Sequence, residues 1–206
     1  VILRVKQLEE ANQKEVVLTG VNLSQYRSKY VENNTERIID FADLLKILLE
    51  KTTNINFRIS SLYPDRVPSE LAPILSNPSV CPHFHLSLQS GCNETLKRMN
   101  RKYTAEEYYE VCVRLRKYFE EPALTTDVIV GFAGETEEEF AECKAFLEKI
   151  EFFETHVFKF SIRKGTRAAK MENQVSDQIK TKRSNELLAL HAENSVKYLE
   201  KHFEKD

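Results

Sequence analysis

Two kinds of hydrophobic pattern alternate along the chain. Short runs with strand-like alternation predict β-strands at 15–20, 56–61, 83–90, 124–132 and 155–162. Runs in which apolar residues recur every three or four positions predict helices at 41–51, 69–77, 105–119, 137–150 and 176–203. Residues 1–13 read as the latter part of a further helix. This rhythm is typical of βα units, and it predicts a parallel sheet with right-handed crossovers.

Local signals support these helix starts. Thr104 with Glu107, and Thr136 with Glu139, have the spacing of a capping box. The last helix has Ser176 or Asp177 available as its cap. The polar stretch 24–40, by contrast, is predicted to be a long loop that is mobile or contacts a partner.

The strand at 83–90 has an unusual polar face. Its apolar face consists of Phe84, Leu86 and Leu88. The opposite face carries His83, His85, Ser87 and Gln89. An ordinary core strand does not bury imidazole, hydroxyl and amide groups in a row, so this face is predicted to line a cavity that holds a polar ligand. A metal site built from Cys81, His83 and His85 is the weaker interpretation, because three ligands on one strand rarely close a tetrahedron.

Composition limits the classes of protein that fit. The chain has 206 residues, of which 41% are hydrophobic and 30% charged, with a formal net charge of −2. These values suit one compact soluble domain, and no apolar run has the length of a membrane span. The balance of charge disfavours bulk electrostatic binding to nucleic acid, so any RNA contact must be local.

The four cysteines are widely separated in the sequence. Cys81, Cys92, Cys112 and Cys143 form no clustered thiolate motif, so neither a structural zinc site nor an iron–sulfur site is indicated within this chain. With no secretory segment in the sequence, four reduced thiols in a cytoplasmic protein are expected.

The polar and glycine-rich chemistry gathers after the predicted strands. The segments are 19–22, 60–61, 89–91, 131–135 and 163–166, and they contain all five glycines. In parallel α/β proteins ligands bind at the carboxyl ends of the strands. The pattern therefore predicts an active-site mouth at that end of the sheet.

Four segments in this order resemble the radical S-adenosylmethionine methylthiotransferases. They are EVVLTGVNLSQY, HFHLSLQSGCNETLKRMNRKYT, TTDVIVGFAGETEEEF and HVFKFSIRKGTRAAKMENQV. The resemblance covers essentially the whole chain and is strongest to the branch that modifies threonylcarbamoyladenosine beside the tRNA anticodon. Related branches act on isopentenyladenosine of tRNA or on ribosomal protein S12. One departure is Ala133, where the family usually has proline; the change relaxes a turn without removing a functional group.

The resemblance implies a fold and a domain organisation. The implied fold is α/β, an incomplete (β/α)6 partial TIM barrel with parallel strands. Residues 1–206 would form a single radical-SAM core fragment with strands two to six and the final helix. The first strand, its CxxxCxxC cluster loop, the N-terminal cysteine domain and the C-terminal TRAM domain would lie outside the chain.

The resemblance also implies cofactor contacts. Residues expected to bind S-adenosylmethionine are Thr19, Gly20, Asn22, Ser60, Ser61, Gln89, Ser90, Asp127, Val130 and Gly131. Each segment has an ordinary alternative role as a strand-ending turn or a strand-end hydrogen bond. Glu135 is interpreted as a charge that stabilises the start of the following helix. The [4Fe–4S] clusters of the family would have no ligands in this chain, and no catalytic residue is assigned.

A basic segment follows the polar strand and is the candidate tRNA contact. The expected contacts are Lys97, Arg98, Arg101, Lys102, Tyr103 and Arg163. Cationic groups beside an aromatic ring can hold phosphates and stack a base, although a solvated helix face would have the same composition.

The implied activity is 2-methylthiolation of tRNA by radical chemistry, with the tRNA anticodon loop as substrate and a separate electron donor. The 206-residue chain alone is expected not to cleave S-adenosylmethionine reductively. Two other classes stay open. One is a TIM-barrel lyase or aldolase, for which Lys159 is the candidate Schiff-base residue. The other is a non-catalytic RNA-binding module, which would bind tRNA with a steep salt dependence.

Overall fold

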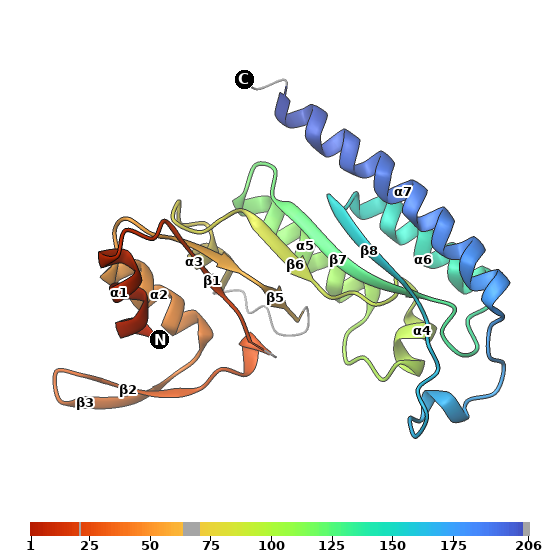
Figure 1. The fold of residues 1–206 in the computed structure, drawn as a ribbon, viewed down its shortest axis with the longest axis horizontal. Coiled ribbons are helices and arrows are strands. Elements are labelled where there is room, and N and C mark those ends of the chain that lie inside the picture. The colour runs from red at the N-terminus through yellow and green to blue at the C-terminus, as the bar shows by residue number, and fades with distance from the viewer. Residues whose placement is uncertain (21, 64–70, 204–206) are drawn as a thin grey trace. The chain divides into compact units, whose positions relative to one another are not determined.

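The computed structural model describes residues 1–20, 22–63 and 71–203, and the chain forms two compact units. The first unit comprises Val1–His85 and Val113–Pro122, and the second comprises Leu86–Cys112 and Ala123–Asp206. Figure 1 shows the elements of both. No helix among the described residues is long and apolar enough to cross a membrane. The expectation of a single core domain stays a prediction.

The elements follow the alternation of the hydrophobic pattern. The α-helices are α1 (Ile2–Glu10), α2 (Phe41–Lys51), α3 (Leu71–Leu75), α4 (Asn93–Arg98), α5 (Ala105–Tyr118), α6 (Glu137–Ile150) and α7 (Asp177–Phe203). The strands are β1 (Glu15–Leu18), β2 (Ser28–Glu32), β3 (Thr35–Ile39), β4 (Asn56–Ile59), β5 (Ser61–Leu62), β6 (His83–Leu86), β7 (Ala123–Val130) and β8 (Glu154–Lys159). Short 3-10 turns occur at Leu23–Gln25 and Ala168–Lys170.

Every predicted strand and helix position contains an element, although some elements are shorter than the patterns suggested. The strand predicted over 83–90 ends at Leu86, and the one predicted over 56–61 divides into β4 and β5. The first two residues of the helix predicted at 69–77 lie outside the described residues. The helix α4 adds an element that the hydrophobic pattern did not indicate.

In the first unit, parallel strands pack against amphipathic helices. Strand β1 pairs with β4 in parallel, from Glu15 opposite Asn56 to Leu18 opposite Ile59. Helix α2 starts with a capping box between Asp40 and Asp43. It buries the apolar residues Phe41, Leu44, Leu45, Ile47 and Leu48. Burial of such a face stabilises a fold by roughly 1.5–3 kcal/mol per large side chain.

The prediction of a loop over residues 24–40 is wrong for most of its length. Strands β2 and β3 form an antiparallel hairpin across Asn33 and Asn34, whose φ angles are +50° and +64°. Two adjacent asparagines with positive φ suit the tight turn that a two-residue hairpin needs. Almost every residue of both strands is exposed or half-exposed, so no apolar alternation marked them.

The second unit is built on β7 and β8. These strands pair in parallel from Thr125 opposite Glu154 to Val130 opposite Lys159. Helix α6 buries Phe140, Cys143, Leu147 and Ile150, and α7 lies along β8 (Figure 1). Both Thr-x-x-Glu capping boxes are confirmed, because each Glu backbone N–H donates to its Thr side chain and each Glu carboxylate accepts from its Thr backbone.

A polypeptide segment that continues from β6 runs along β7. The backbone N–H of Gln89 donates to Asp127 (2.8 Å), and Ile129 donates to the carbonyl of Gln89 (2.9 Å). The Thr126 hydroxyl donates to the carbonyl of Leu86 (2.7 Å). Phe84, Leu86 and Leu88 are fully buried, which confirms the predicted apolar face of this stretch.

Candidate functional site

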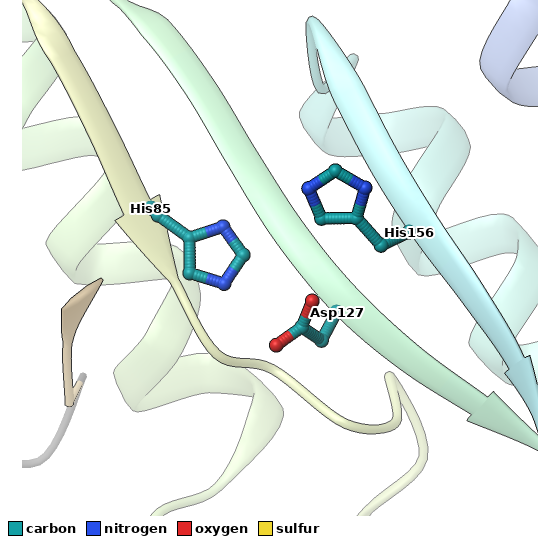
Figure 2. A group of neighbouring side chains, drawn as sticks. All are labelled: His85, Asp127 and His156. Atoms are coloured by element: carbon teal, nitrogen blue, oxygen red, sulfur yellow. The ribbon is translucent and has the colours of Figure 1, made fainter. Parts of the chain in front are cut away.

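Two polar side chains lie side by side on the second unit's strands. Asp127 of β7 is the register partner of His156 of β8, so both project from the same face of the sheet (Figure 2). His156 is 43% exposed at its side chain. The third side chain labelled in the figure, His85, lies on β6 and belongs to the first unit.

A cavity of about 490 Å³ lies in the second unit, along β7 and the carboxyl end of β8. Its walls are Gln89, Asp127, Ile129, Phe158, Lys159, Phe160, Ser161, Arg163, Thr166 and Ala168. A volume of this size lies within the range that holds small ligands and nucleosides. The structure thus brings together three residues from the sequence-based sets: Gln89 and Asp127, expected at the cofactor, and Arg163, expected at tRNA.

Gln89 is held in the cavity wall by an unusual backbone conformation. Its φ angle is +73°, which is uncommon for a residue with a side chain. The two backbone hydrogen bonds to β7 fix this conformation, and the residue is 9% exposed. Such over-determined backbone conformations concentrate at functional sites.

Arg163 reaches the cavity from a turn that follows β8. The carbonyl of Arg163 accepts hydrogen bonds from the backbone N–H and the hydroxyl of Thr166, at 3.2 and 2.8 Å. Gly165 within the turn has a φ of +87°, a conformation that glycine adopts at little cost.

The aromatic walls of the cavity were missed by the sequence analysis. Phe158 is 53% exposed although it lies on a strand, and Phe160 packs edge-on against Phe132 with 4.8 Å between ring centroids. Their place at the end of the strand predicted over 155–162, just before Arg163, is the sequence signal that could have identified them.

Ser90 is buried and bonds to the neighbouring backbone. It is 1% exposed, and its hydroxyl accepts from the backbone N–H of Cys92 at 3.2 Å. This bond gives Ser90 a local structural role just before α4, and its expected contact with the cofactor stays a prediction.

Tyr103 does not offer a stacking surface. It is 5% exposed, and its hydroxyl donates to the carbonyls of Ser87 and Leu88, each at 2.8 Å. These hydrogen bonds fix the backbone of the polar segment, and the expected contact of Tyr103 with tRNA stays a prediction.

The basic segment contains one cation that pairs with a carboxylate and three that line a surface hollow. Arg98 forms a bidentate ion pair with Glu139, the residue that closes the α6 capping box, and its contact through Nη1 is 2.8 Å. This hydrogen bonding lowers the pKa of Glu139 below its ordinary value. Arg98 is therefore engaged within the protein rather than offered to a phosphate. Lys97, Arg101 and Lys102 line a separate surface hollow of about 480 Å³.

Val130 and Gly131 support the fold around the β7 end. Val130 is 1% exposed. Gly131 has a φ of +70°, and its backbone N–H donates to the carboxylate of Glu135 at 2.9 Å. Any contribution of these residues to a ligand would come from their backbone rather than from a side chain.

Glu135 forms a buried ion pair. Its carboxylate lies 2.6 Å from Nη1 of Arg183, and both side chains are less than 5% exposed. Burial raises the pKa of Glu135 above its ordinary value, against the opposing hydrogen bond from Gly131 and the charge of Arg183. The interpretation of Glu135 as a helix-terminal charge is corrected: it ties the turn after β7 to α7.

The first unit carries the remaining expected cofactor residues at two strand ends. Thr19 and Gly20 follow β1 and are exposed, whereas Ser60 and Ser61 follow β4 and are half-buried. Ser60 donates its backbone N–H to Leu18 at 3.0 Å, so these two strand ends are neighbours. Asn22 accepts a hydrogen bond from the Ser24 hydroxyl.

The four cysteines form no disulfide, and their thiols do not lie in one cluster. Cys92, Cys112 and Cys143 are buried, and Cys81 is half-buried with its thiol 3.3 Å from Glu15. Among the described residues, no cysteine belongs to a group of side chains that could hold a metal ion.

These environments predict selective alkylation. Burial raises the pKa of the Cys143 thiol to about 12, which leaves almost no thiolate at pH 8. We expect iodoacetamide to label Cys81 on the order of tenfold faster than Cys143 in the folded protein, because alkylation requires an accessible thiolate. Peptide mass spectrometry over a time course measures both rates. In urea the four cysteines should react alike, and equal rates in the native protein would contradict the burial of Cys143.

Comparisons with known proteins give concordant results. The model of the Radical SAM superfamily matches residues 1–147. The threonylcarbamoyladenosine tRNA methylthiotransferase MtaB of Treponema pallidum is 46% identical over 200 residues, which is 97% of this chain and 40% of that protein. The protein of the same name from Bacillus subtilis is 40% identical over 96% of this chain and 43% of its own length.

A third sequence relative and one solved structure agree with these matches. The tRNA-2-methylthio-N(6)-dimethylallyladenosine synthase of Alkaliphilus oremlandii is 37% identical over 98% of this chain and 43% of its own length. Among solved structures, the radical SAM enzyme coproporphyrinogen III oxidase HemN of Escherichia coli superposes with a TM-score of 0.59 at 19% identity. That superposition covers 74% of this chain and 36% of HemN, and it supports the α/β fold with parallel strands. The chain thus spans 40–43% of the length of these three methylthiotransferase relatives.

Proposed function

Because the chain belongs to the radical SAM superfamily, we propose that the whole protein is a tRNA methylthiotransferase acting on threonylcarbamoyladenosine next to the anticodon. The chain would supply the part of the barrel that binds S-adenosylmethionine and positions the nucleoside. The observation that carries this proposal is the cavity beside the β7 and β8 strand ends, where Gln89, Asp127 and Arg163 meet aromatic walls.

The cavity suits a purine nucleoside. The rings of Phe158 and Phe160 offer apolar faces to a base, since aromatic side chains stack on nucleobases. Gln89 can donate and accept hydrogen bonds at a base edge or a ribose. The negative charge of Asp127 favours a cationic centre, such as a sulfonium, in the same space.

The cofactor contacts form two groups. In the second unit, Gln89, Asp127 and the backbone at Val130 and Gly131 would contact S-adenosylmethionine. In the first unit, Thr19, Gly20, Asn22, Ser60 and Ser61 offer hydroxyl, amide and backbone groups at two strand ends and stay expected cofactor contacts. When bound to a reduced cluster, S-adenosylmethionine supplies a carbon radical that can remove hydrogen from an unactivated carbon.

Three cations of the second unit line a separate surface hollow and are the proposed contacts of a larger substrate. Lys97, Arg101 and Lys102 share one hollow and would contact phosphates of the anticodon arm. Such contacts position a nucleic acid without reading its sequence. The electron donor that reduces the cluster is a further proposed partner, and a cytoplasmic location is proposed because the substrate is tRNA.

The test uses the whole protein with its clusters reconstituted under anaerobic conditions. We expect tRNA bearing threonylcarbamoyladenosine to gain a methylthio group, detected by mass spectrometry of the digested nucleosides. Asp127→Asn should lower the rate by about tenfold or more, because among the described residues that line the cavity it removes the one carboxylate while preserving the shape. Glu154→Gln, a change on β8 outside the cavity lining, is the matched control.

The outcome separates the alternatives. Product from isopentenyladenosine tRNA or ribosomal protein S12, with none from threonylcarbamoyladenosine, would refute the proposed substrate. Trapping of a carbonyl substrate on Lys159 by borohydride would instead support a Schiff-base enzyme. Salt-sensitive tRNA binding without any product would support an RNA-binding module.

A further inference from the structure

Arg163 occupies a distinctive place in the cavity of the second unit. It belongs to the turn after β8, and its carbonyl is held by two hydrogen bonds from Thr166. The adjacent Lys164 belongs to the same turn but does not line the cavity. The turn therefore directs one of two neighbouring cations towards the ligand space.

The charges that line this cavity are few. They are the carboxylate of Asp127 and the cations Lys159 and Arg163, with the remaining walls apolar or neutral. The ammonium of Lys159 lies 3.5 Å from the Thr181 hydroxyl of α7. Since Asp127 repels anions, a ligand with a carboxylate requires a cation in the cavity to offset that repulsion.

The nucleosides in the names of the relatives differ in charge at one position. A threonylcarbamoyl group on adenosine carries the threonine carboxylate, whereas a dimethylallyl group is a neutral hydrocarbon. The planar guanidinium of arginine matches a carboxylate with two parallel hydrogen bonds. A hydrocarbon substituent would leave that guanidinium without a partner.

We infer that Arg163 binds the carboxylate of the threonylcarbamoyl group and thereby determines specificity for this nucleoside. The inference rests on the proposed function and adds to it a residue that reads the modification already present on the base. Phe158 and Phe160 would hold the base while Arg163 reads the substituent.

The experiment measures binding and turnover with the reconstituted whole protein. Its ligands are one anticodon stem-loop carrying threonylcarbamoyladenosine, the same stem-loop with that carboxylate blocked as a methyl ester, and the stem-loop with unmodified adenosine. Arg163→Gln is compared with Lys164→Gln, which removes the neighbouring cation from the same turn, and with the wild type.

We expect the wild type to bind the free carboxylate more tightly than the ester. Arg163→Gln should weaken binding of the free carboxylate about 10- to 100-fold, the range of a lost charged hydrogen bond, and leave the ester within about twofold. Lys164→Gln should leave the preference unchanged. Arg163→Lys should recover part of it, because the charge returns without the planar fork.

Two outcomes would overturn the inference. Equal weakening of all three stem-loops by Arg163→Gln would make Arg163 a phosphate contact, while methylthiolation by the wild type would leave the proposed function intact. A wild type that modifies none of the stem-loops and ignores the carboxylate would refute both the proposed function and the inference. Circular dichroism confirms that each variant is folded.

Discussion

Replacing Arg183 with methionine is expected to lower the free energy of unfolding by about 3–5 kcal/mol, because it leaves the Glu135 carboxylate buried without its cation. The guanidinium donates to both the side chain and the backbone carbonyl of Glu135, at 2.6 and 3.2 Å. It also reaches Glu137 at 3.0 Å. Urea unfolding followed by circular dichroism measures the change.

The matched control is Lys182→Met on the same helix. Lys182 also faces Glu137, at 3.7 Å, but its side chain is 67% exposed. An exposed pair contributes about 0–1 kcal/mol, so this variant should unfold almost like the wild type. Equal losses in the two variants would contradict a special role for the buried pair.

The loss of unfolding free energy caused by Arg183→Met should also depend on pH. Burial already raises the pKa of Glu135 in the folded protein, and removal of the cation should raise it further. A carboxyl whose pKa is raised by folding is least destabilising when it is protonated in both states, and its cost grows as pH rises from the unfolded pKa to the folded pKa and is constant above it. Arg183→Met should therefore cost less stability at pH 5 than at pH 8. Glu135→Gln in the same background should remove most of that difference.

Replacing Gly131 with alanine is the second large expected effect, about 2–4 kcal/mol. An added Cβ would lie 2.3 Å from Cγ of Lys180, a buried side chain whose ammonium is 3.2 Å from Asp177. Cγ lies near the backbone, so Lys180 cannot yield by moving only its far end, and overpacking of this kind costs about 1–3 kcal/mol. The positive φ of +70° adds roughly 1 kcal/mol for any residue with a Cβ.

Gly165→Ala separates the two contributions. Gly165 has a φ of +87° but no atom within 4 Å of its added Cβ. This variant should therefore lose only the backbone contribution, about 1 kcal/mol. Equal losses at both glycines in urea unfolding would refute the clash with Lys180. Cofactor binding by Gly131→Ala must be measured at a temperature where the variant is folded.

The hydrophobic periodicity of the sequence predicted most helices and strands, because it depends only on which residue types follow one another over a few positions. Helix α6 begins and ends where the sequence pattern placed it, since its capping box and buried face are both encoded within 15 residues. The hairpin of β2 and β3 escaped prediction because it is exposed on both faces. Helix α4 has only 6 residues, too few for a clear helical period.

The sequence indicated where in the fold the candidate site lies. It indicated less well which residues line that site. Strand-end position indicated Gln89 and Arg163, because parallel strands place their carboxyl ends at one edge. Asp127 lies within β7 and was expected from the family resemblance. Ser90 and Tyr103 have polar atoms that suit a ligand equally well, and only their burial shows that these atoms serve the protein backbone.

The sequence by itself determined the βα rhythm, the capping of the helices and the family to which the chain belongs, since these depend on residue types at short, fixed spacings. The tertiary structure decided which cations are available to a ligand. Arg98 and Arg183 look like Arg163 in the sequence, but each has a carboxylate partner brought near from over 40 residues away. Pairing across such distances depends on how strands and helices pack, and no local pattern encodes it.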